Sequence, residues 1–125
     1  MNYRIDTIPY FEKELKQLGK KYKSLKQDYA NLLNELHANP VAGTDLGRGI
    51  HKVRMAIASK NRGKSHGARV IDFVYEINEA SGVILLLDIY DKAEQESIPP
   101  HRIAELLAIA REFLNITDEN FMKDR

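Results

Sequence analysis

Apolar residues recur at steps of three and four between residues 10 and 38, the spacing that lines up side chains along one face of a helix. The stripe consists of Phe11, Leu15, Leu18, Tyr22, Leu25, Tyr29, Leu32, Leu33 and Leu36. Ser24, followed three residues later by Gln27, matches a capping box, so the pattern predicts two helices with a break near Tyr22–Ser24. The alternation in YRIDTI just before Pro9 predicts a short strand ahead of this helical hairpin.

After Asn39-Pro40 and the Gly-rich connection VAGTDLGRG, the apolar period changes to two, which is typical of strands. In residues 50–58 one face carries Val53, Met55 and Ile57, and the other carries Lys52 and Arg54. The run RVIDFVYE has no cleanly polar face, and VILLLDIY is apolar on both faces, as expected of a central strand. Pro99-Pro100 then begins a helix with apolar positions up to Leu114, and a polar tail follows.

The order strand, two helices, three strands and a helix predicts an α+β fold. We expect an N-terminal strand and a helical hairpin packed on a small, mainly antiparallel sheet with a C-terminal helix, all in one domain spanning residues 1–125. The chain has no cysteine, which excludes disulfides and thiolate chemistry. The N-terminus lacks a signal pattern, and the longest apolar run, GVILLL, is far shorter than the roughly 20 residues of a membrane span. These features favour a cytoplasmic protein that does not enter a membrane.

Charge is strongly segregated along the chain. No acidic residue lies between Asp45 and Asp72, whereas this segment contains the seven bases Arg48, Lys52, Arg54, Lys60, Arg62, Lys64 and Arg69. The whole chain has 19 Lys+Arg and 18 Asp+Glu, so without these seven bases the remainder has 12 against 18, a charge of −6. A concentrated cationic segment attracts polyanions such as nucleic acid. The alternative interpretation is a solvated hairpin tip next to an exposed strand face with extended lysine and arginine stems.

Several segments in a fixed order resemble a known family. They are the F-x-K-x-L-K-x-L pattern at Phe11–Leu18, Asn39-Pro40, GTDLGRGIHKVR at Gly43–Arg54, GKSHGARVI at Gly63–Ile71 and IYDKAEQESIP at Ile89–Pro99. Together they are similar to the RelE/ParE family of type II toxin–antitoxin toxins, in particular its HigB/RelE-like branch. The resemblance implies a small sheet flanked by helices, a cofactor-free mRNA endonuclease acting in the ribosomal A site, and a cognate antitoxin encoded beside it.

The family's catalytic positions match Lys52 and Arg54 on the strand after the helical hairpin, Arg69 at the start of the next strand, and Lys92 after the apolar strand. Two positions depart from the best-studied branch. Ala93 stands where that branch has a further arginine, and Ile98 stands where it has an aromatic residue. The departures leave open a second hypothesis, a ParE-like or catalytically weak member that acts by binding gyrase or nucleic acid. A plain nucleic-acid-binding module is a third.

Metal-free RNA cleavage needs positioning, a proton acceptor and cations where phosphate charge accumulates. The four family positions can supply the cations, and we consider as RNA-binding residues Arg48, Lys60, Arg62, Lys64, His66 and Tyr90. His66 in the basic loop is also a candidate acid–base group, and Tyr90 at a strand end could stack on a base, although a core role is the alternative. His51 should face the same side as Val53 and therefore favours a core or interface role. No spacing of histidines and carboxylates suggests a metal site.

Overall fold

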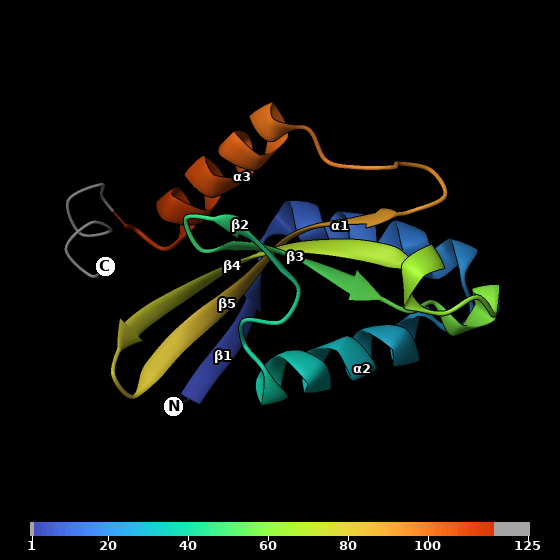
Figure 1. Cartoon of the computed structure of the whole chain (residues 1–125), viewed down its shortest axis with the longest axis horizontal. Coiled ribbons are helices and arrows are strands. Elements are labelled where there is room, and N and C mark those ends of the chain that lie inside the picture. The colour runs from blue at the N-terminus through green and yellow to red at the C-terminus, as the bar shows by residue number, and fades with distance from the viewer. Residues whose placement is uncertain (1, 117–125) are drawn as a thin grey trace.

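Residues 2–116, which the computed structural model describes, contain a five-stranded mixed sheet and three helices (Figure 1). In chain order the elements are β1 (Asn2–Thr7), α1 (Pro9–Lys21), α2 (Leu25–Ala38), β2 (Thr44–Gly47), β3 (Ile50–Met55), β4 (Ala68–Asn78), β5 (Ser81–Asp91) and α3 (Pro100–Phe113). Two short 3-10 turns, η1 (Ala58–Lys60) and η2 (Lys64–His66), lie in the basic loop between β3 and β4. The predicted α+β class and C-terminal helix are confirmed. The predicted polar tail, residues 117–125, lies outside the described residues.

The strands are arranged in the order β1-β5-β4-β3-β2. Only the β1–β5 pair among these strands is parallel, so the sheet is mainly antiparallel, as expected. Strand β5 lies between β1 and β4 and is buried from Gly82 to Asp91, which explains why VILLLDIY has no polar face.

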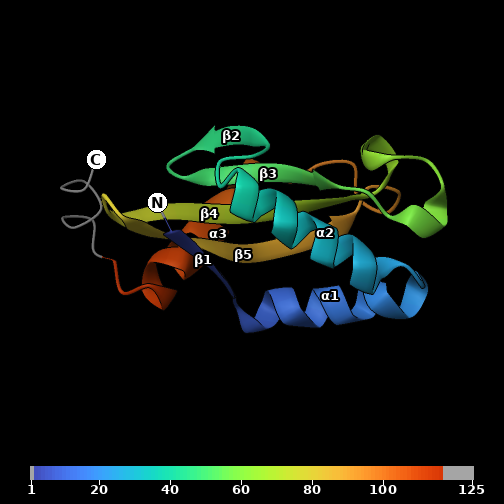
Figure 2. The ribbon, with the colours of Figure 1, turned by 90° about the horizontal axis from the view of Figure 1, so that it is seen from below.

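Helices α2 and α3 lie on opposite faces of the sheet, and α1 runs beside β5 (Figures 1 and 2). Helix α2 covers the face that carries Met55. Helix α3 covers the other face, where Arg102 lies within electrostatic reach of Asp88. Lys52, Ile71 and Asp88 are cross-strand partners and therefore share this second face. No helix within residues 2–116 is long and apolar enough to cross a membrane.

Strand β2 was not predicted, because its sequence TDLG contains a single apolar residue and no alternation. It is an exposed edge strand whose register shifts between Asp45 and Gly47. Gly43, just before β2, must be a glycine because the backbone of β3 lies very close to it. Gly43 has a φ of +93°, and a Cβ atom there would lie 2.4 Å from the carbonyl oxygen of Lys52.

The break between α1 and α2 lies where the sequence predicts it. The predicted capping box of Ser24 and Gln27 is wrong. Ser24 precedes α2 without capping it, and its hydroxyl instead donates to the Asp28 carboxylate at 2.7 Å. Gln27 bonds Asn31, one turn further along the helix. The Ser24 hydroxyl also accepts from the backbone N–H of Ser59 at 2.8 Å. These contacts therefore join α2 to the basic loop instead of satisfying the helix end.

Candidate nucleic-acid interface

Two arginines are directly opposed across β3 and β4. In the antiparallel register Arg54 is the partner of Arg69, and Lys52 is two residues earlier on the same face of the sheet. Directly opposed side chains have Cβ atoms roughly 5 Å apart, so like charges in this position repel each other. The pair is unfavourable for folding by itself, and an anion bound near both positive charges would offset the repulsion.

Arg69 is held by backbone carbonyl groups. Its guanidinium donates to the oxygens of Lys64 at 3.2 Å, Ser65 at 3.1 Å and Ala68 at 3.2 Å. The residue is only 5% exposed, so these contacts fix the direction of the planar group. Three of the five N–H donors of the guanidinium are therefore used inside the protein, and the exposed surface of Arg69 is as small as that of Tyr90.

Tyr90 in β5 and Lys92, which directly follows this strand, lie at the same end of the sheet. Tyr90 is the cross-strand partner of Arg69, but it is 7% exposed, and its hydroxyl is buried with no hydrogen-bond partner among the described residues. Burial raises the pKa of Tyr90 above its ordinary value. Its ring therefore has little free surface on which a base could stack. Lys92 donates to the Glu96 carboxylate at 2.7 Å, and this hydrogen bond lowers the pKa of Glu96.

The other basic candidates of the loop differ in how much of each side chain is exposed. Arg62 and His66 are exposed. Lys64 is also exposed, and its ammonium group lies 2.9 Å from the Glu35 carboxylate of α2. The Lys60 side chain is only 12% exposed, so it faces the protein and not the solvent. Thus the loop presents Arg62, Lys64 and His66 to a polyanion, but not Lys60.

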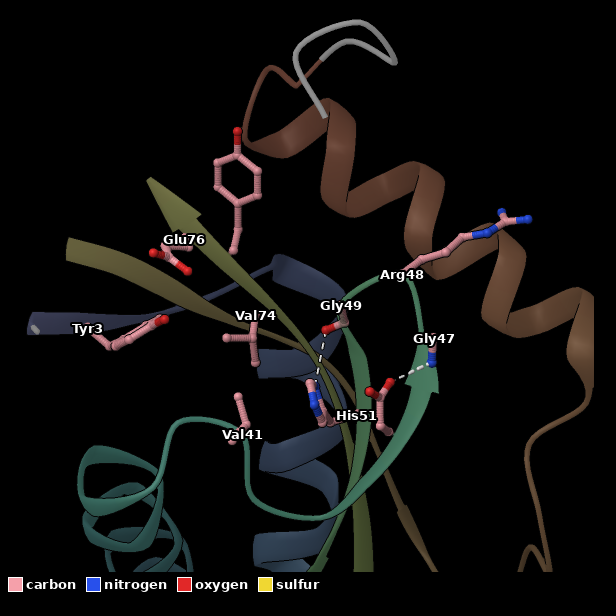
Figure 3. A pocket seen from close by; sticks show the side chains of 10 residues that line it. Tyr3, Val41, Gly47, Arg48, Gly49, His51, Val74 and Glu76 are labelled. Carbon is pink, nitrogen blue, oxygen red and sulfur yellow. Dashed lines mark hydrogen bonds between the residues drawn. The ribbon is translucent and has the colours of Figure 1, made fainter. Parts of the chain in front are cut away.

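A separate cavity of about 510 Å³ opens at the far end of β3 (Figure 3). It is lined by Val41, Val74 and His51 together with Arg48, whose side chain extends away from the other three in Figure 3. Arg48 lies in the turn between β2 and β3, whereas Arg54 is near the other end of β3, four residues or roughly 13 Å along the strand from Ile50. Arg48 is therefore not part of the Arg54–Arg69 site.

His51 forms the inner wall of this cavity and covers a buried acid. It is 7% exposed, in agreement with its predicted core or interface role, and its Nδ1 lies 3.2 Å from the carbonyl oxygen of Gly49. The same nitrogen is 3.8 Å from Asp72, which is fully buried and whose carboxylate has no hydrogen-bond partner among the described residues. Burial raises the pKa of Asp72 well above its ordinary value.

We expect Asp72→Asn to become increasingly more stable than the wild type as the pH rises. Because the folded-state pKa of Asp72 is raised, protonation stabilises the fold fully below the ordinary pKa of 3.8, and this stabilisation is lost as the pH rises through the folded-state pKa. The difference in unfolding free energy should grow by about 1.4 kcal/mol per pH unit between those two values. Urea unfolding at a series of pH values measures it. Asp45→Asn, at an exposed residue of the same cavity, is the control; parallel curves for Asp72→Asn and wild type would contradict the expectation.

Two of the buried acids, Asp72 and Asp91, were not predicted from the sequence as functional residues. Asp72 interrupts an apolar strand pattern and Asp91 ends one, and this is the signal that could have identified them, because a buried carboxylate needs a partner. Asp72 stands opposite His51 in the register, and Asp91 ends β5 beside the basic loop.

Within the described part of the chain, no group of three or more histidine or acidic side chains could hold a metal ion. The sequence matches none of the known protein-family models with which it was compared, and no curated protein matches it. The resemblance to the RelE/ParE family therefore stays a hypothesis.

Proposed function

We propose that this protein is the toxin of a type II toxin–antitoxin system and cleaves mRNA on the ribosome, as its resemblance to the RelE/ParE family implies. The observation that carries the proposal is the opposed pair Arg54 and Arg69, with Lys52 on the same sheet face. Two positive side chains at opposed positions disfavour each other, and a phosphate group bound near both would offset that repulsion through charge-assisted hydrogen bonds.

The proposed reaction is attack of the ribose 2′-oxygen on the neighbouring phosphorus, in which the 2′-hydroxyl gives up its proton and the leaving 5′-oxygen takes one up. The bond from phosphorus to the 5′-oxygen breaks, and a 2′,3′-cyclic phosphate and a 5′-hydroxyl end result. Negative charge accumulates on the phosphate oxygens in the transition state, where fixed donors contribute most. Arg54 and Arg69 would bind these oxygens, and Lys52 and Lys92 would add positive charge around them.

A second candidate function is binding without cleavage, either to gyrase in the manner of ParE or to nucleic acid. Three features favour it. Ala93 contributes no cation, Ile98 is buried at 9% exposure and offers no ring, and Tyr90 is itself buried. A member that only binds RNA would show a steep salt dependence of affinity and no cleavage products.

The proposed partners are the ribosome with its mRNA and an antitoxin protein encoded in the adjacent reading frame, and the proposed place of action is the cytoplasm. An antitoxin would find apolar surface on α3, where Ile109 and Phe113 are one helical turn apart and 37% and 48% exposed. The antitoxin would also contact the basic residues of the proposed site on β3 and β4.

Inducing this protein alone in a bacterial host should arrest growth, and co-expressing the neighbouring antitoxin should restore it. The arrest follows from cleavage of the mRNA that the ribosome is translating. Growth curves together with mapping of RNA 5′ ends near ribosomal A sites measure both effects. A variant in which Lys52, Arg54 and Arg69 are all alanine, expressed to the same soluble level, is the control. Normal growth with abundant soluble wild-type protein would count against the toxin function.

A further inference from the structure

Asp91, the last residue of β5, joins three segments that are distant in sequence. Its side chain has no exposed surface, and its carboxylate accepts from the ammonium group of Lys60 at 2.5 Å, from the Tyr22 hydroxyl at 2.5 Å and from the backbone N–H of Ala93 at 2.9 Å. Burial opposes ionisation, but the hydrogen bonds from Lys60 and Tyr22 outweigh it and lower the pKa of Asp91 to about 2. The carboxylate is therefore a fixed negative charge that holds Lys60 in place.

Lys60 connects this carboxylate to the second half of the basic loop. Its ammonium group also donates to the backbone oxygen of His66 at 2.8 Å and lies 5.3 Å from the centre of the Tyr22 ring. The positive charge of Lys60 is therefore paired with groups of the protein itself. A lysine so enclosed cannot also neutralise a phosphate group of RNA.

The loop segment that Lys60 fixes is the one that holds Arg69. His66 ends the turn η2, and the first two residues of that turn, Lys64 and Ser65, supply two of the three carbonyl groups that accept from the Arg69 guanidinium. Hydrogen bonds thus connect Asp91 to Lys60, Lys60 to the last residue of η2, and the first two residues of η2 to Arg69.

We propose that Lys60, held by Asp91 and Tyr22, is a positioning residue that fixes η2 and through it the direction of the Arg69 guanidinium. The inference rests on the proposed function, since it assigns Lys60 to the orientation of a catalytic arginine and removes it from the RNA-contacting residues. Its effect on cleavage should appear in kcat, because a misdirected guanidinium weakens stabilisation of the transition state more than binding of the ribosome complex.

Lys60→Met tests this directly, with Lys21→Met as a matched control. Lys21 also contacts Asp91, at 3.4 Å, and also lies 5.3 Å from the Tyr22 ring, but its short contact at 2.5 Å is to Glu94, outside the basic loop. We expect Lys60→Met to lower kcat by roughly 10- to 100-fold with little change in KM. Lys21→Met should leave both constants within about twofold, a difference of less than roughly 0.5 kcal/mol.

Hydrogen exchange of the free protein gives a second measurement that needs no RNA. The backbone N–H groups of His66 and Gly67 donate to Gly63 and Lys64, and both should exchange faster in Lys60→Met but not in Lys21→Met. Tyr22→Phe removes only the hydroxyl group on Asp91, so it should shift exchange and kcat in the same direction by less. It serves as the variant of choice if Lys60→Met does not fold.

The outcomes separate the inference from the proposed function. A higher KM and a lower salt slope, with kcat and exchange unchanged, would make Lys60 an RNA contact and overturn the inference. Unchanged exchange of His66 and Gly67 in both Lys60→Met and Tyr22→Phe would overturn it as well. If the wild-type protein cleaves no RNA, the proposed function fails, and the exchange experiment still decides whether Lys60 fixes the loop.

Discussion

Replacing Arg69 by alanine should lower ribosome-dependent mRNA cleavage by about 10²–10³-fold, the loss that follows removal of one preoriented donor to a developing oxyanion in other enzymes. The expectation depends on the geometry of the site. Arg69 is opposite Arg54, and three carbonyl groups hold its guanidinium in one direction before any substrate arrives. Cleavage of a defined mRNA on purified ribosomes under single-turnover conditions measures the effect.

Two further variants make this result interpretable. Arg69→Lys keeps the positive charge but loses the planar fork, so it should recover only a small part of the activity if bidentate contact matters. Arg62→Ala removes an exposed loop cation and should weaken binding modestly with a salt slope lower by about one charge. If Arg69→Ala and Arg62→Ala reduce cleavage equally while circular dichroism shows both folded, the segment is a docking surface and not an active site.

The elements with strong periodicity could be predicted from the sequence, and those without it could not. The apolar stripe of residues 10–38 gave both helices of the hairpin, and the continuous apolar run of β5 identified a strand buried on both faces. The edge strand β2 was missed because four residues with one apolar side chain have no detectable period. The capping box failed because the Ser24 hydroxyl has better partners in Asp28 and the distant Ser59, which no local pattern reveals.

For the site, strand alternation was sufficient to place Lys52 and Arg54 together on one face, because the period of two is a property of the backbone. It was not sufficient to tell which cations are available to a ligand. Lys60 and Arg62 are equivalent in the sequence, yet one is enclosed by Asp91 and the other is exposed. That difference arises from a contact between residues 31 positions apart, and composition or periodicity contains no information about it.

Asp91→Ala should destabilise the fold by about 3–5 kcal/mol, the usual effect of removing one partner from a buried ion pair. The variant leaves the ammonium group of Lys60, 12% exposed, without its carboxylate, and it also removes the acceptor of the Tyr22 hydroxyl. The matched control is Glu94→Ala. Glu94 pairs with Lys21 at 2.5 Å, but its side chain is 61% exposed, so its removal should change stability by less than about 1 kcal/mol. Urea unfolding at neutral pH compares the two.

The pH dependence of the unfolding free energy gives a second test of the effect of Asp91→Ala. Because the folded-state pKa of Asp91 is lowered to about 2 from its ordinary 3.8, its ionisation stabilises the fold fully above pH 3.8, and this stabilisation is lost as the pH falls through 2. Asp91→Ala has no carboxyl group at this position and therefore lacks this stabilisation at every pH. The unfolding free energies of wild type and variant should approach each other between pH 4 and pH 2. If the difference between them stayed constant over that interval, the ionised Asp91 would not be what holds Lys60, and the connection from β5 to the basic loop would have to depend on backbone contacts such as the hydrogen bond from Lys92 to Gly67.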